Sequence, residues 1–182
     1  MRSLPEPAPS DLAAWKDRLA RQKAKEEASF AYLIRSAGWG RAGSEKIAKL
    51  YSEPQLGELD DATLLIRVGF ALYDTERYEE ALRIFRKLFD QAGQDALSQG
   101  VALVWQGHLL DLLGRRDEAV QTYQKAVDLK VSGHVQHAQY NMMYSPSSYA
   151  AERIKEPFRR IENTADGAAA DPLRKHGATD KP

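Results

Sequence analysis

One pattern of residues occurs twice between residues 62 and 130, and it limits the folds that this chain can adopt. The first copy contains Leu65, Gly69, Leu72, Ala81 and Phe85, and the second contains Leu103, Gly107, Leu110, Ala119 and Tyr123. Each residue of the first copy precedes its counterpart by 38 positions. The large apolar residues within a copy follow the three- and four-residue spacing of an amphipathic helix. The repetition therefore predicts two successive helical hairpins that stack on each other.

Small residues stand at matching places in both copies. Gly69 and Gly107 interrupt runs of good helix formers, where a glycine costs about 1 kcal/mol relative to alanine. We interpret them as points where two helices approach too closely for a Cβ, with Ala81 and Ala119 as the small residues on the opposing helix. Gly114 is well placed to end a helix in the left-handed conformation.

The two copies resemble the tetratricopeptide repeat, whose pattern is a large apolar residue, then Leu-Gly-x-x-Tyr, then Ala-x-x-x-Phe. Three departures stand out: Gln106 replaces the family's leucine, Gly93 and Val131 replace its final proline, and the period exceeds the usual ~34 residues. The resemblance implies an all-α fold, a short right-handed α-solenoid of antiparallel helical hairpins. It also implies a scaffold or adaptor that binds other proteins or peptides rather than an enzyme.

The pattern along the chain suggests three parts. We expect a flexible lead at 1–9, a helical domain at 10–163 and a disordered tail at 164–182. Within the domain we expect a degenerate repeat-like hairpin at 29–53, repeats at 62–91 and 95–130, and a capping segment at 131–163. A long N-terminal helix from Ser10 to Ile34 opens the domain, and an irregular stretch from 131 to 144 leads to a last helix that Pro157 breaks near Glu156.

Composition narrows the class of partner. Lys plus Arg equals Asp plus Glu at 26 each, so bulk charge gives no reason to expect nucleic acid as the main partner. The chain has no cysteine, and it lacks both a signal-peptide pattern and an apolar run approaching the ~20 residues of a membrane span. These features predict a cytoplasmic protein without direct membrane insertion, or the soluble part of a larger one.

His134 and His137 are the one pair with metal-like spacing in the sequence. A zinc site needs three or four good donors, and the neighbouring side chains are only amides. We therefore predict no metal ligand, no cofactor and no catalytic residue. A metal-dependent or hydrolytic site around these histidines is the remote alternative.

In the family, the first helix of each repeat lines a concave groove that binds partners. The corresponding positions here are Thr63, Ile66, Phe70, Tyr73 and Asp74 in the first copy, and Val101, Val104, His108, Asp111 and Leu112 in the second. Apolar, aromatic and acidic side chains at these positions disfavour a clamp for terminal carboxylates. They favour a groove for an apolar or aromatic segment.

Two alternatives stay open at this point. The chain's own helices can cover Phe70, Tyr73 and Val104, which would leave no open groove. The protein can also be a structural or oligomerisation module, whose apolar faces pair with another copy or with a neighbouring domain. A further candidate surface is the basic face of the first helix, around Arg18, Arg21 and Lys25, although charged residues on a helix are usually just its solvated face.

Overall fold

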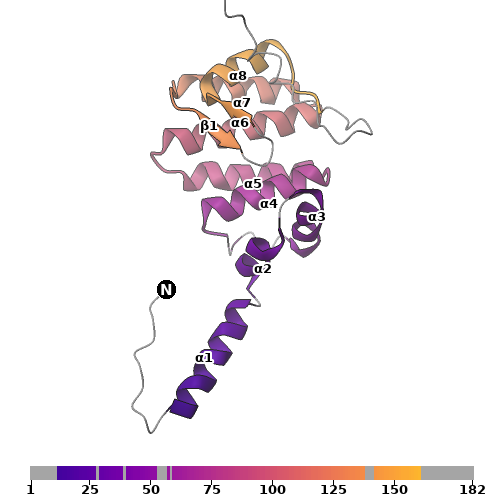
Figure 1. Cartoon of the computed structure of the whole chain (residues 1–182). Coiled ribbons are helices and arrows are strands. Elements are labelled where there is room, and N and C mark those ends of the chain that lie inside the picture. Colours follow the sequence, from indigo (N-terminus) through magenta and orange to yellow (C-terminus); the bar gives the residue numbers. More distant parts are fainter. Residues whose placement is uncertain are drawn as a thin grey trace, which may run out of the picture.

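The computed structural model describes residues 12–27, 29–38, 40–52, 57, 59–137 and 142–160. The expected lead at 1–9 and the expected tail at 164–182 lie outside these residues. Eight helices are described: α1 (Leu12–Glu27), α2 (Phe30–Ser36), α3 (Gly40–Leu50), α4 (Ala62–Asp74), α5 (Tyr78–Gln91), α6 (Ala96–Leu112), α7 (Arg116–Asp128) and α8 (Pro146–Lys155). Figure 1 shows α2 to α8 stacked on one another, with α1 projecting from the stack, and this arrangement confirms the all-α solenoid.

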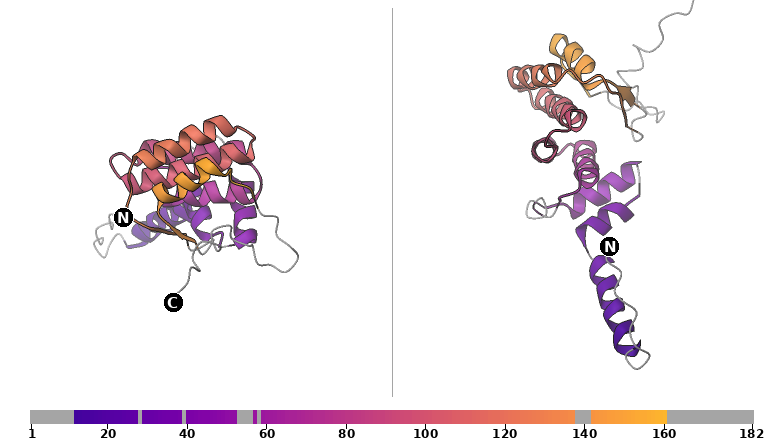
Figure 2. Two further views of the ribbon diagram at one scale, coloured as in Figure 1. Left: turned by 90° about the horizontal axis from the view of Figure 1, so that it is seen from above. Right: turned by 90° about the vertical axis from the view of Figure 1, so that its left-hand side faces the viewer.

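Two hairpins, α4–α5 and α6–α7, form the centre of the stack. Helix α5 packs against α6, so both hairpins share one core, and Figure 2 shows this part of the stack with several helices nearly end-on. A Cβ on Gly69 would lie 2.8 Å from the Phe85 ring, and one on Gly107 would lie 2.3 Å from the Tyr123 ring. The predicted reason for both glycines, close approach between the helices of a hairpin, is confirmed.

The turns inside the two hairpins have the same construction. Gly114 adopts the predicted left-handed conformation with φ 74°, and its counterpart Glu76 has φ 63° without being glycine. In both turns the next residue, an arginine, donates its backbone N–H to a helix carbonyl at 2.8 Å, and its side chain pairs with a glutamate three residues later. The 38-residue repetition therefore extends to the hydrogen bonds of the backbone.

Gln106 accounts for one departure from the family pattern. Its side-chain amide donates to the backbone oxygen of Phe85 at 3.1 Å, and the residue is buried. The oxygen belongs to α5 and the amide to α6, so Gln106 joins the two repeats where the usual leucine would make apolar contacts only.

We expect Gly107→Ala to lower the free energy of unfolding by about 1–3 kcal/mol, because the added methyl group would overlap the buried ring of Tyr123. Chemical denaturation measures the change. Gly57→Ala is the matched control, since a Cβ there meets nothing within 4 Å. Equal stability of the two variants would mean that the hairpin does not close around Gly107 as described.

The N-terminal region differs from the sequence-based expectation. The single helix predicted from Ser10 to Ile34 is two helices, because Ser29 caps α2 by accepting the backbone N–H of Tyr32 at 3.2 Å. Helix α3 already begins at Gly40, within the predicted loop, and packs on α4. The Ser44 hydroxyl donates to Asp74 at 2.6 Å across this contact. The interpretation of 29–53 as a repeat-like unit stays a prediction.

The C-terminal region also departs from the expectation. Strands β1 (Val135–His137) and β2 (Met142–Tyr144) form an antiparallel ribbon where irregular chain was predicted, with Val135 opposite Tyr144. Helix α8 packs on α6 and α7 and ends at Lys155, so the predicted break before Pro157 is confirmed. Phe158 was expected on the apolar side of this helix, but it lies in the extended chain that follows.

Candidate protein-interaction surface

The predicted groove residues lie on α4 and α6, the first helices of the two repeats. Some of these residues are exposed, some are half-buried and some are buried. Thr63 is exposed and Ile66 is half-buried. Asp74 and Leu112 are half-buried, and the Asp111 side chain is 1% exposed. The buried members of the set are Phe70, Tyr73, Val101, Val104 and His108. The surface formed by these α4 and α6 residues is here called the A-helix face.

An aromatic cluster underlies this face. The ring of Trp105 lies edge-on to Phe70 at 4.6 Å and to Tyr73 at 5.4 Å, and it stacks on Phe85 at 5.7 Å. Edge-to-face and offset-stacked pairs at such distances stabilise a protein beyond the area that they bury. Phe70 is therefore part of the core in this conformation, and its removal would test stability before it tested binding.

Residues 156–160, here called the strap, leave α8 and cross the A-helix face. The Phe158 ring stacks on His108 with centroids 3.9 Å apart and an angle of 15°. Its backbone N–H donates to Oδ2 of Asp111 at 2.8 Å. The chain itself therefore covers His108 and Asp111 on α6. This differs from the alternative that the sequence left open, in which the chain's own helices cover Phe70, Tyr73 and Val104, because the strap is not helical.

Arg160 extends the strap to the first repeat. Its guanidinium donates to Glu76 Oε1 at 3.2 Å, to Tyr78 Oη at 3.0 Å and to the backbone oxygen of Asp74 at 3.2 Å. It also lies 5.3 Å from the centroid of the Tyr73 ring. The arginine thus joins residues more than eighty positions earlier in the chain, at the turn between α4 and α5.

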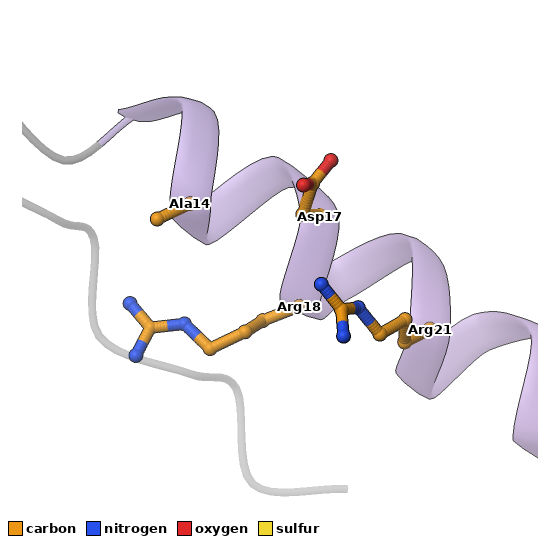
Figure 3. Close-up of a pocket in the computed structure, with 4 residues that line it drawn as sticks. All are labelled: Ala14, Asp17, Arg18 and Arg21. Carbon is orange, nitrogen blue, oxygen red and sulfur yellow. The ribbon is translucent and has the colours of Figure 1, made fainter.

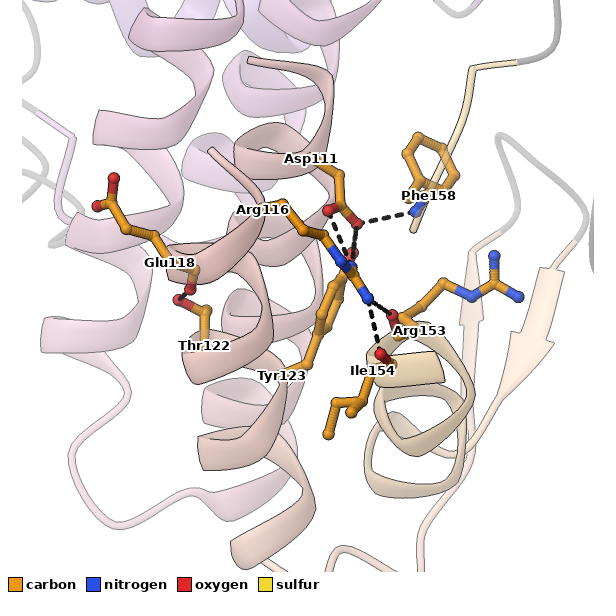
Figure 4. A network of polar contacts seen from close by, with 8 residues as sticks. All are labelled: Asp111, Arg116, Glu118, Thr122, Tyr123, Arg153, Ile154 and Phe158. Carbon is orange, nitrogen blue, oxygen red and sulfur yellow. Dashed lines mark hydrogen bonds and ion pairs between the residues drawn. The ribbon is translucent and has the colours of Figure 1, made fainter. Parts of the chain in front are cut away.

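Asp111 is the centre of the polar network under the strap, which Figure 4 shows. Its carboxylate accepts from Arg116 Nη1 at 3.0 and 3.2 Å, from Tyr123 Oη at 3.1 Å and from the Phe158 backbone. Arg116 Nη2 donates to the backbone oxygens of Arg153 and Ile154 at the end of α8, at 2.9 and 2.7 Å. One ion pair therefore fixes both α8 and the start of the strap.

The sequence analysis missed Arg116 and Arg160, which hold the strap. Arg116 occupies the place of Tyr78 in the other repeat, so the repeat pattern gives no reason to expect an ion pair there. Arg160 follows a proline in extended chain, where helical periodicity carries no information. The one available signal was Pro157, because the residue before a proline favours an extended backbone.

The surroundings of His134 bear on the alternatives based on metal binding and hydrolysis. Within the residues that the structure describes, no three His, Cys, Asp or Glu side chains lie close enough to hold a metal ion. His134 is exposed, and the side chain of His137 is outside the described set. The nearby serines have structural contacts: Ser145 donates to Val131 O at 3.0 Å, and Ser147 donates to Ala126 O at 2.7 Å.

The basic residues of the first helix lie beside a surface hollow on α1. Figure 3 shows Arg18 and Arg21 extending on the same side of the helix as Ala14, with Asp17 nearby. The helix projects from the stack (Figure 1), and Leu12 and Leu19 on it are 45% and 42% exposed. None of the helices in the described ranges is long and apolar enough to cross a membrane.

Burial of Tyr73 under the strap predicts a loss of stability at high pH. Burial raises the pKa of Tyr73 from 10.0 to about 12, so the folded protein disfavours the tyrosinate that the unfolded chain forms. The stabilising contribution is complete below pH 10.0 and is lost as the pH rises to about 12. Burial raises the pKa of Tyr123 and Tyr144 in the same direction.

Thermal unfolding measured across this pH range checks the prediction. Tyr73→Phe is the control, because it keeps the ring and removes the titrating hydroxyl. The alkaline loss of stability should be smaller in this variant than in the wild type. An identical pH profile for both proteins would contradict the assignment to Tyr73.

Comparison with known families supports the repeat assignment. Residues 60–130 match the family model described as Tetratricopeptide repeat. The matched range spans α4 to α7 and the residues that the sequence analysis assigned to two repeats. Comparisons with curated proteins and with solved structures gave no match.

Proposed function

Because residues 60–130 belong to the tetratricopeptide repeat family, we propose that this protein is a scaffold or adaptor whose A-helix face binds a segment of a partner protein. Repeats of this family generally mediate protein–protein interaction, and stacked helical hairpins present a continuous concave surface for it. The proposal assigns no catalytic residue, no cofactor and no nucleic acid partner.

The observation that carries the proposal is the strap. An extended segment lies across α4 and α6, and it is held by side chains at predicted groove positions: Tyr73, His108 and Asp111. A surface that binds its own chain in this way has the shape and the hydrogen-bond acceptors to bind an extended segment of another protein.

The proposed site has an accessible part and a covered part. Thr63 and Ile66 on α4 are accessible, while Tyr73, His108 and Asp111 lie under the strap. Phe70, Val101 and Val104 are buried in the core. We expect apolar contacts to supply most of the affinity, since fully burying one such side chain contributes about 1.5–3 kcal/mol and an exposed ion pair about 1 or less.

The test begins with affinity purification of partners on the full chain and continues with titration of a purified partner. Ile66→Ala should weaken binding, whereas Val127→Ala should not, because Val127 is an equally half-buried apolar residue on the second helix of its hairpin. Binding should also persist when salt is raised. Strong salt sensitivity without any effect of Ile66→Ala would reject the A-helix face as the site.

An oligomerisation module is the second candidate, and helix α1 is the observation that favours it. Its exposed Leu12 and Leu19, seven residues apart, lie near one side of a helix that projects from the stack (Figure 1). Pairing of α1 with a second copy would bury both. Light scattering at several protein concentrations tests this candidate, and a monomer at all of them would exclude it.

A further inference from the structure

The strap reaches the A-helix face as extended chain. Its first residue, Glu156, has φ −130° and ψ 122°, and Pro157 prevents α8 from continuing. The strap then passes from Asp111 on α6 to the turn after α4, and it contacts both repeats through alternate residues. Phe158 is buried and Arg160 is half-buried, while Arg159 between them is exposed. Alternation of this kind is how an extended peptide presents every second side chain to a surface.

The first contact point accepts an aromatic side chain. The Phe158 ring lies parallel to the imidazole of His108, which is itself 1% exposed, and Tyr149 stands edge-on to the same imidazole at 5.3 Å. The Asp111 carboxylate accepts a hydrogen bond from the backbone N–H of Phe158. That hydrogen bond is available to any non-proline residue, so the stacked ring supplies the selectivity.

The second contact point fits arginine. Its acceptors are a carboxylate, a phenol oxygen and a backbone carbonyl, and the face of Tyr73 lies beneath the guanidinium. A planar guanidinium donates in several directions at once and stacks on an aromatic ring, whereas an ammonium group is a compact charge on a flexible stem. The arrangement therefore distinguishes arginine from lysine.

We propose that the strap is a tethered ligand, and that the surface beneath it binds a partner segment with an aromatic residue followed two positions later by an arginine. This inference rests on the proposed function and specifies its partner. The partner segment displaces the strap. The closed conformation described here therefore competes with the partner segment and lowers its apparent affinity.

The experiment titrates a capped peptide with the sequence of residues 155–160, Lys-Glu-Pro-Phe-Arg-Arg, into full-length protein. The wild type is compared with Phe158→Ala/Arg160→Ala, which releases the strap, and with Arg159→Ala as the matched control for an exposed neighbour. If the wild type is closed in about nine molecules of ten or more, the released variant binds the peptide at least about tenfold more tightly than the wild type. Arg159→Ala should bind it as the wild type does.

Peptide variants test the two contact points separately. Alanine in place of the peptide's phenylalanine, or lysine in place of its last arginine, should weaken binding to the released variant. Equal binding of all three peptides, or equal affinity of the wild type and the released variant, would overturn the proposal. The peptide results can contradict the proposal while a captured partner still loses affinity on Ile66→Ala. That combination would reject the tethered ligand and leave the proposed function intact.

A second measurement needs no substitution. In the wild type, excess peptide should speed hydrogen exchange at the Phe158 amide, because that amide loses its bond to Asp111. The peptide is added at a concentration that saturates the released variant, or at the highest attainable concentration if that variant does not fold. An unchanged exchange rate under these conditions would overturn the proposal. If the wild type forms a concentration-dependent dimer and the released variant does not, the strap binds a second copy of the chain. This result too would overturn the proposal.

Discussion

Replacement of Asp111 by alanine should lower the free energy of unfolding by about 3 kcal/mol. Breaking a buried ion pair by removing one partner typically costs 3–5 kcal/mol, because the remaining groups lose their counterpart. The Asp111 side chain is 1% exposed and the Arg116 side chain is 31% exposed, so water can rehydrate part of the arginine and the lower end of the range applies. The Tyr123 hydroxyl and the Phe158 amide also lose their acceptor.

Urea denaturation measures this change from the midpoint and slope of the transition. Asp117→Ala is the matched control, since Asp117 is an exposed acid at the start of α7 and should contribute about 1 kcal/mol or less through the helix dipole. A loss as small for Asp111→Ala as for Asp117→Ala would show that the carboxylate does not hold α7, α8 and the strap together.

Truncation after Lys130 should have the largest effect on the fold. It removes three buried aromatic residues, Tyr144, Tyr149 and Phe158, and uncovers the side of α6 on which they pack. Each such side chain contributes about 1.5–3 kcal/mol when fully buried, and a whole domain is stable by only about 5–15 kcal/mol. The truncated protein should aggregate or unfold without cooperativity.

Truncation after Asn163 provides the comparison, because it keeps every residue that the structure describes. Thermal unfolding and light scattering of the two truncated proteins and the full chain measure the contrast. Equal melting temperatures for all three would exclude a stabilising role for α8 and the strap.

The repeats could be predicted from the sequence because their constraints are local and occur twice. Gly69 and Gly107 are each explained by an aromatic ring sixteen residues later, within the same hairpin. Gly114 needs only its own turn to explain its left-handed conformation. Matching at a fixed period of 38 then located both hairpins without any knowledge of the tertiary fold.

The covering of the A-helix face could not be predicted in the same way. It depends on contacts between residues far apart in sequence, such as Arg160 with Asp74, and on an extended segment that has no helical periodicity. Asp111 was assigned to the groove from its position in the repeat, but the sequence does not reveal that its acceptors are used by Arg116, Tyr123 and the Phe158 backbone.

Gln106 shows an intermediate case. The sequence identified it as a departure from the family pattern, but it did not reveal what the departure does. Its hydrogen bond reaches Phe85 O, twenty-one residues earlier in the preceding repeat, and only the packed pair of repeats brings the two groups together.

The central claim, that the A-helix face is where a partner binds, is tested most directly by photo-crosslinking. A photoreactive residue is placed at Thr63, exposed on the A-helix face of α4, or at Gln121, exposed on α7. A third protein carries it at Arg18 on α1. With a partner captured on the full chain, we expect crosslinking from Thr63 and none from the other two positions. Crosslinking from Gln121 or Arg18, without any from Thr63, would contradict the claim.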